Sequence, residues 1–210
     1  MKINLNLNFI TPFIFFLLFG CENNTIIQNQ YIDPHIIFSS RRWWNYDIFI
    51  ADIYGGNMTQ LTKNKWIDFN PSISPDSKKL VFISDRDGNR NIYTMKINGD
   101  DLQQITFNGL DDYEPIFSPD GESIIFTTER DGNKEIYSYS LISKYIKNLT
   151  NNSGDDWNPR FYQDGRKIVF QSSRDGNWEI YLMNLDGKNQ RNISNHPSTD
   201  YSYIVLPLIN

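Results

Sequence analysis

The chain has 210 residues and a formal net charge of −5 at pH 7, so its charge does not favour binding to nucleic acid. It contains a single cysteine, which excludes an internal disulfide. Aromatic residues make up 15% of the sequence, a proportion typical of sheet-rich proteins with many cross-strand pairs.

The N-terminal segment is predicted to be a targeting signal rather than part of the fold. Residues 9–19 are apolar apart from a threonine and a proline, and this stretch is too short to span a bilayer. It leads into Gly20 and Cys21, an arrangement that resembles a bacterial lipoprotein signal. We therefore expect a signal peptide over residues 1–20 and lipidation of Cys21. The alternative is a cleaved secretory signal followed by an incidental cysteine.

Residues 21–34 are predicted to form the lipidated cysteine and a flexible tether, because the segment is rich in Asn and Gln. No aspartate follows Cys21 directly. By resemblance to known lipoprotein sorting, this favours anchoring at the outer membrane, on the periplasmic side of the bacterial cell envelope.

An internal repeat of 44 residues runs from Phe38 to Tyr201 without slippage. A fixed period in this range, with strand-like content, is typical of propeller blades or solenoids. The same residue types recur at equivalent positions, among them Arg42, Arg86, Arg130 and Arg174; Ile48, Ile92, Ile136 and Ile180; and Asp68, Asp112, Asp156 and Asp200.

One repeat contains four predicted antiparallel strands, enough for one blade. Turn chemistry separates them: Ser118-Pro119-Asp120-Gly121 and Arg130-Asp131-Gly132-Asn133 are both strong turn signals. The predicted strands are Pro115–Phe117, Ser123–Thr128, Glu135–Ser140 and Tyr145–Leu149.

These motifs resemble the WD-like propeller repeat of the TolB family, most clearly over Ser74–Tyr93 and Ser118–Tyr137 and more loosely over Asp164–Tyr181. The resemblance implies an all-β propeller over residues 35–210. It does not imply one activity, because this repeat serves binding proteins, peptidase accessory domains and lyases alike. Family members usually have six or more blades, whereas this chain supplies about four.

The order of the repeats predicts how the ends meet. The first repeat lacks a first strand and begins near His35–Ser39, and the last adds only a first-type strand, Ser202–Leu206. These parts together would make a shared fourth blade and close a four-bladed ring, which removes exposed edges. The alternative is a truncated fragment of a larger propeller, which would be unstable or would pair with a second copy.

Catalytic groups are not recognisable in the sequence. The two histidines, His35 and His196, lie near the ends of the domain, and no Gly-x-Ser-x-Gly motif is present. The histidine-rich metal site expected of related lyases has no counterpart. We therefore expect a protein that is not an enzyme.

Four repeated carboxylates, Asp68, Asp112, Asp156 and Asp200, are candidates for a cation or ligand ring at the mouth of a channel, where oxygen ligands would suit Ca²⁺. The alternative is that each caps the turn into its strand. The arginine series is interpreted as structural, each guanidinium pairing with an aspartate of a neighbouring blade. The alternative is a role in anion binding. We expect no other cofactor.

Tryptophans in turns are candidates for a partner surface, because exposed tryptophans favour protein contacts or sugar stacking. They are Trp43, Trp44, Trp66 and Trp178, and Trp157 is a further aromatic of this kind. The alternative is that these rings pack between blades and belong to the core. The predicted function is an envelope-anchored, non-catalytic interaction or scaffold module with an envelope protein as its partner. The alternatives are a ligand-binding or hydrolytic protein acting on envelope glycan or peptide, and a fragment without an independent role.

Overall fold

The structure, a computed structural model, describes residues 35–42, 44–162 and 165–205. All of them belong to the second of the two units, Met1–Ile32 and Asp33–Asn210, into which the chain divides. The predicted signal peptide, Cys21 and the tether lie outside the described residues. Among the described residues, no helix is long and apolar enough to cross a membrane.

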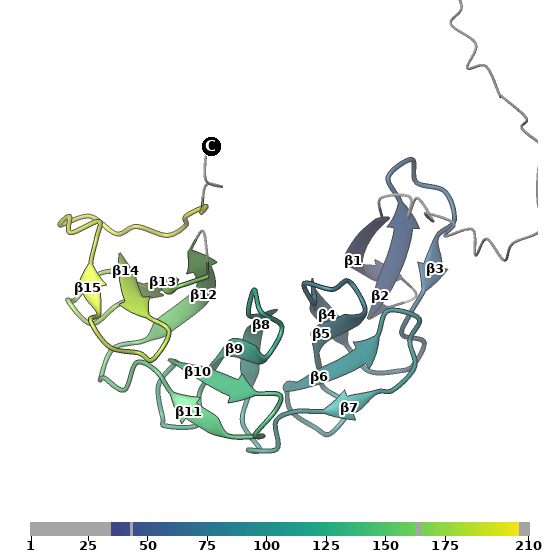
Figure 1. Ribbon diagram of the computed structural model, residues 1–210, viewed down its shortest axis with the longest axis horizontal. Helices are drawn as coiled ribbons and strands as arrows, with labels where there is room; N and C mark the ends of the chain where they lie inside the picture. The colour runs from purple at the N-terminus through teal and green to yellow at the C-terminus, as the bar shows by residue number, and fades with distance from the viewer. Residues whose placement is uncertain (1–34, 43, 163–164, 206–210) are drawn as a thin grey trace, which may run out of the picture. The chain divides into compact units, whose positions relative to one another are not determined.

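Within the described residues, fifteen strands form four antiparallel sheets that follow one another along the chain (Figure 1). The first sheet has three strands, β1 (His35–Arg42), β2 (Asn45–Asp52) and β3 (Thr59–Gln60). The other three have four strands each: β4 (Asp68–Ile73), β5 (Lys79–Ser84), β6 (Asn91–Lys96) and β7 (Gln103–Gln104); β8 (Asp112–Phe117), β9 (Ser123–Thr128), β10 (Glu135–Ser140) and β11 (Ile146–Asn148); β12 (Asp156–Tyr162), β13 (Lys167–Ser172), β14 (Glu179–Asn184) and β15 (Arg191–Asn192). The predicted all-β fold built from four-stranded blades is confirmed.

The turn chemistry explains why these strands begin and end where they do. Ser118-Pro119-Asp120-Gly121 joins β8 to β9, and Gly121 has φ +74°, a conformation that glycine adopts without strain. The Asp120 carboxylate accepts hydrogen bonds from the Ser118 hydroxyl at 2.5 Å and the Glu122 amide at 2.9 Å. These bonds favour the ionised carboxylate and therefore lower the pKa of Asp120.

The core lies between the faces of neighbouring sheets. In β5, Leu80 and Phe82 pack against the first sheet, while Val81 on the opposite face packs against the third. Because neighbours cover both faces, the central strands are apolar throughout instead of alternating with polar residues. Equivalent rings, Phe82, Phe126 and Phe170, are fully buried in β5, β9 and β13. Burial of each such ring stabilises the fold by about 1.5–3 kcal/mol.

The sheets follow one another along an arc, with β4, β8 and β12 on the inner side and β7, β11 and β15 on the outer side (Figure 1). Strand contacts between sheets join only sheets that are adjacent in the sequence, so the first and fourth sheets do not meet within the described residues. The predicted closure into a four-bladed ring by a shared blade is therefore not observed. Strand β1 remains at the edge of a three-stranded sheet.

The C-terminal segment explains this difference. Residues 201–205 form no strand in the structure, and they lie against the fourth sheet instead of β1. Tyr203 takes the place that proline has in the other repeats. Its hydroxyl contacts two backbone carbonyl oxygens of the fourth sheet, Asn158 O at 2.5 Å and Val169 O at 2.8 Å. The segment is thus anchored to its own preceding sheet.

A close approach at Gly187 sets the spacing between the third and fourth sheets. A methyl group there would overlap the Leu149 carbonyl oxygen and would lie 3.0 Å from Leu149 Cα. We expect Gly187→Ala to lower the free energy of unfolding by about 2–4 kcal/mol, because it adds inter-sheet overpacking to the strain of a positive φ. Denaturant unfolding measures this loss.

Gly176→Ala is the matched control in the same sheet. Gly176 has φ +98°, but a Cβ there meets nothing within 4 Å. This control should lose only about 1–2 kcal/mol from backbone strain. Equal losses in the two variants would show that Gly187 does not limit the approach of the sheets.

Candidate functional site

Each four-stranded sheet contains a buried ion pair that joins its innermost strand to the turn after its second strand. The three aspartates, the first residues of β4, β8 and β12, have no exposed side-chain surface. The pairs are Arg86–Asp68 at 3.1 Å, Arg130–Asp112 at 3.5 Å and Arg174–Asp156 at 3.0 Å. Burial raises the pKa of Asp112, whose distance to its arginine is the longest of the three.

The arginine of every repeat is held in the same way by its own sheet. Its Nε donates to the Ser or Thr hydroxyl two residues earlier, and its guanidinium lies over an aromatic ring. The hydroxyls are those of Ser40, Ser84, Thr128 and Ser172, at 3.3, 2.9, 3.1 and 2.7 Å. The rings are those of Phe49, Tyr93, Tyr137 and Tyr181, with centroids at 4.4, 4.5, 4.6 and 4.6 Å.

This geometry corrects one interpretation and weakens another. The arginines pair with aspartates within their own sheets, not in neighbouring blades as expected, because both residues stand at the same end of adjacent strands. The predicted cation or ligand ring gains no support, since Asp68, Asp112 and Asp156 are each neutralised by a guanidinium. Asp200 is partly exposed, and no ion pair joins it to a described arginine. The described ranges contain no group of three or more His, Cys, Asp or Glu side chains able to hold a metal ion.

The inner strands share a second feature that the sequence did not reveal. Strands β4, β8 and β12 each contain a register shift two residues after their aspartate. At these bulges Asn70, Glu114 and Asn158 adopt positive φ values of 56°, 51° and 55°. Asparagine tolerates this conformation, but glutamate does so less readily. Arg160 binds Glu114 at 3.2 Å and so links neighbouring inner strands.

The described tryptophans lie at one end of the sheets, in the turns after the second strand or at the start of an inner strand. Trp44 is 92% exposed in the turn between β1 and β2, and Trp66 is 36% exposed before β4. Trp178 and Trp157 are half-buried. Trp43 lies outside the described residues. The predicted partner surface therefore includes residues of one common rim, and Trp157, which the sequence also singled out as a surface aromatic, lies on the same rim.

Aromatic rings and cations alternate along this rim, which we call the aromatic rim. The Arg90 guanidinium lies 5.6 Å from both the Phe69 and Tyr113 rings. The Tyr113 and Trp157 rings are 5.0 Å apart, and Lys134 Nζ lies 4.5 Å from the Trp157 ring. These contacts bridge successive sheets, so the rim is a continuous surface and not a set of separate turns.

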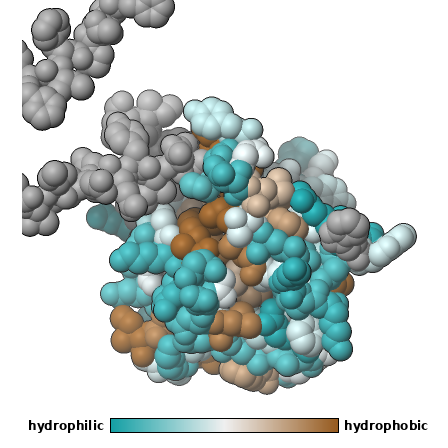
Figure 2. Space-filling model, turned by 90° about the vertical axis from the view of Figure 1, so that its right-hand side faces the viewer, coloured by the Kyte–Doolittle hydropathy of each residue, from teal (hydrophilic) through white to brown (hydrophobic). Residues whose placement is uncertain are grey.

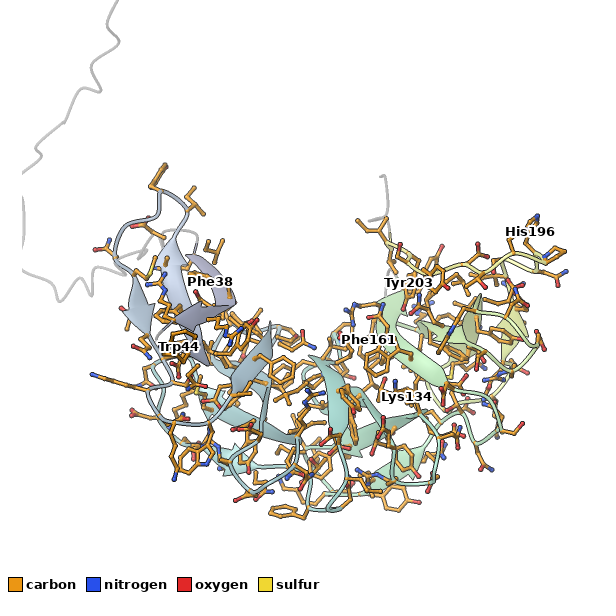
Figure 3. All side chains as sticks on the ribbon, turned by 180° about the vertical axis from the view of Figure 1, so that it is seen from behind. Phe38, Trp44, Lys134, Phe161, His196 and Tyr203 are labelled. Atoms are coloured by element: carbon orange, nitrogen blue, oxygen red, sulfur yellow. The ribbon has the colours of Figure 1, made fainter. Side chains whose placement is uncertain are left out.

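A pocket of about 310 Å³ lies at the end of the aromatic rim, where the third and fourth sheets meet. Figure 3 labels Lys134, one of the residues that line it. Its lining residues are Lys134, Trp157, Gln171, Trp178 and Tyr201. Planar rings beside an ammonium group are suited to stacking on a sugar, a proline or an aromatic side chain while holding a carboxylate. The Gln171 side-chain amide donates to the Tyr201 carbonyl oxygen and so holds this wall of the pocket.

Sequence reasoning missed Lys134, Gln171 and Tyr201 as members of a site. Two repeat series in the sequence could have indicated this site. One series, with a period of 44 residues, consists of Tyr46, Arg90, Lys134 and Trp178. The other is an aromatic series with the same period, and it consists of Phe69, Tyr113, Trp157 and Tyr201. Neither series alone indicates a site. Side chains of the two series lie next to one another only because adjacent sheets approach closely, and the repeat period does not specify that approach.

The chain matches a family described as the TolB beta propeller domain, over residues 33–115 and 109–206. No protein with a curated description matches it. Solved structures similar to it include two TolB proteins. A putative TolB from Agrobacterium tumefaciens is 25% identical with a TM-score of 0.69, and the alignment covers 75% of this chain and 60% of that one. TolB from Acinetobacter baumannii is 30% identical with a TM-score of 0.65, covering 75% and 41% of the two chains.

The present chain thus spans less than two thirds of the length of these two relatives. A third similar structure is an oligogalacturonate lyase from Vibrio parahaemolyticus, 16% identical with a TM-score of 0.62, covering 77% of this chain and 50% of that one. At this identity, the likeness shows a shared fold and nothing about activity.

The ion pairs are expected to be essential for stability. Asp156→Ala should lower the free energy of unfolding by about 3–5 kcal/mol, because it leaves the Arg174 guanidinium without its carboxylate in a site that is largely withdrawn from water. Thermal and denaturant unfolding of the purified chain measure this loss.

Asp186→Ala provides the control. Its ion pair with Lys188, at 3.7 Å, is largely exposed, and such pairs contribute little to stability. The carboxylate also accepts a hydrogen bond from the Lys188 amide at 3.0 Å in an exposed turn, so we expect a small loss. If both variants lost the same small amount of stability, the buried pair would not hold the innermost strand.

Proposed function

The chain belongs to the TolB β-propeller domain family, and from this premise we propose that it is a non-catalytic binding or scaffold module of the bacterial cell envelope, which uses the aromatic rim to hold an envelope protein. The observation that carries the proposal is the continuity of the rim across successive sheets. Loops supported by a rigid sheet scaffold are a common place for binding residues.

The composition of the rim favours protein binding. Interface cores are enriched in tryptophan, tyrosine and arginine, and a few such residues supply most of the binding energy. Trp44 is almost fully exposed, and Trp178 borders a pocket able to receive one side chain of a partner. Arg90 and Lys134 are held against rings, so their charges are already positioned before a partner arrives.

The proposed location rests on the N-terminal sequence. A signal peptide over residues 1–20 and lipidation of Cys21 would tether the sheets to a membrane, with outer-membrane attachment on the periplasmic side favoured. Stable anchoring by lipid needs two signals, such as two acyl chains, so the proposal implies that Cys21 carries more than one acyl chain.

The pocket supports a second candidate function, which is binding of an envelope glycan or peptide. Trp157, Trp178 and Tyr201 present ring surfaces to it, and Lys134 would pair with an acidic group of such a ligand. A protein ligand and a glycan ligand would contact the same side of the pocket. Variants of the pocket residues therefore have to be tested with each class of ligand separately.

The aromatic rim should be the surface that contacts the partner. A photo-reactive amino acid at position 44 or 178 should yield a discrete cross-linked protein in intact envelopes. Lys134→Glu in the same chain should reduce the yield, because it reverses the charge beside the pocket of the rim. Trp178→Ala should weaken binding of the purified partner by about 30-fold, as expected for a hot-spot residue.

Ile142 is the control position for this experiment. It is 71% exposed in the turn between β10 and β11, at the opposite end of the sheets. Cross-linking there as readily as at the rim, or at neither place, would contradict the proposal. A soluble envelope-glycan fragment that quenches tryptophan fluorescence in the parent chain, but not in Trp178→Ala, would instead favour the second candidate.

Lipidation is tested separately. The parent chain expressed in a bacterium should incorporate a labelled fatty acid and sediment with membranes, and Cys21→Ser should lose both properties because no other thiol exists. Membrane sedimentation of the Cys21→Ser variant equal to that of the parent would contradict the anchor and leave the binding proposal intact.

A further inference from the structure

One end of the arc has a sheet without an innermost strand, and the other end has a segment without a sheet to join. The first sheet consists of β1, β2 and β3 and has no innermost strand among the described residues, so β1 presents a free edge. An edge of this kind is a template for pairing with another strand. Figure 2 shows apolar side chains gathered on the side of the molecule that carries this sheet. Ile36, on β1, is 51% exposed.

The C-terminal segment is positioned as an innermost strand. The Asp200 amide donates to the Trp178 carbonyl oxygen at 2.7 Å. The first residues of β8 and β12 make the same bond to the preceding sheet, Asp112 to Arg90 at 2.8 Å and Asp156 to Lys134 at 2.7 Å. Residues 200–205 therefore begin in the register of an innermost strand, and no described strand lies beside them.

Arg42 is held ready for a carboxylate. Its contacts with Ser40 and the Phe49 ring match those of the three arginines that hold an aspartate. Unlike them, it is exposed, and no ion pair joins it to a described carboxylate. Asp200 is the equivalent of their aspartate partners and has no described arginine. Arg42 and Asp200 are thus the two repeat members without a described partner, and each is positioned like its equivalents in the ion pairs of the other sheets.

The remaining residues of the two parts also match. In the third sheet Asp112 stands opposite Thr128, Ile116 opposite Ile125 and Phe117 opposite Ile124. The same register applied to the two free parts brings Asp200 opposite Ser40, beside Arg42. It also brings Ile204 opposite Ile37 and Val205 opposite Ile36. Ile204, 84% exposed, would then meet an apolar residue.

We propose that residues 200–205 of one copy pair with β1 of a second copy, so that two copies assemble head to tail, each completing the first sheet of the other. The pairs Arg42–Asp200 lock both junctions. This inference goes beyond the binding function and does not depend on it. A two-fold arrangement satisfies both junctions at once and leaves no open edge.

The same chain is a poorer donor for its own β1. Phe38 and Tyr203 stand on opposite arms of the arc (Figure 3), and the first and fourth sheets share no strand contact. The segment is anchored to the fourth sheet through Tyr203 and Gln171.

The test is the mass of the full-length chain in detergent, measured by light scattering. The expected mass is twice that of one chain, which is 24.7 kDa for the 210 residues before removal of the predicted signal peptide. Arg42→Asp and Asp200→Arg should each raise the dimer dissociation constant about 30-fold or more, because each places like charges in the junction. An equimolar mixture of the two variants should restore the dimer, since both junctions then contain opposite charges. Arg41→Asp, the same change at the neighbouring residue, should leave the dimer intact.

A monomeric parent chain would overturn the proposal. So would a result in which the double variant recovers the parent's properties but the mixture of single variants does not, because that outcome indicates closure within one chain. Circular dichroism establishes that each single variant is folded.

A cross-link gives an independent readout that does not depend on the charged pair. In a Cys21→Ser background, mixed Ile36→Cys and Val205→Cys chains should form a disulfide between copies under mild oxidation, because the register places these residues opposite each other. The out-of-register mixture of Ile36→Cys with Tyr201→Cys should form little. Equal yields in the two mixtures would overturn the proposed register.

Discussion

The constraint on which this structure depends is that each sheet is apolar on both faces. A sheet of this kind is stable only when a second sheet covers each face, so the sequence has to supply stacked sheets in series. Fully buried side chains such as Phe82, Phe126 and Phe170 meet that requirement between successive sheets. The arginine–aspartate pairs then fix the innermost strand of each sheet, which determines what lines the inner side of the arc.

Much of the fold was predictable from the sequence, because the 44-residue period indicates repeated blades and the turn motifs mark where the strands begin and end. The strands Ser123–Thr128 and Glu135–Ser140 are bounded by proline, aspartate and glycine turns, and the structure reproduces them to the residue as β9 and β10. Closure was not predictable. It depends on the angle between neighbouring sheets, which close contacts such as Gly187 with Leu149 set and which no residue pattern reports.

The candidate site was predictable only in part for a related reason. Trp44, Trp66 and Trp178 stood out as tryptophans in turns, and they do lie at one rim. Lys134 and Tyr201 look unremarkable in the sequence, since a lysine or tyrosine in a turn is common. They become members of a pocket only because adjacent sheets bring two separate series together. The regular spacing of the aspartates suggested a ring, but three of the four, Asp68, Asp112 and Asp156, are each bound by an arginine of their own sheet.

Contacts between only nearest-neighbour sheets have a consequence for cooperativity. Stability in such an array is close to a sum of terms for each sheet and each junction, as in a one-dimensional chain of coupled units. The second and third sheets have two described junctions each, whereas the outer sheets have one. Amide exchange should accordingly be slowest in the middle of the arc and faster toward its ends, and a substitution in the third sheet should uncouple the two halves. We therefore expect partial unfolding to begin in the first and fourth sheets, while the second and third sheets remain folded.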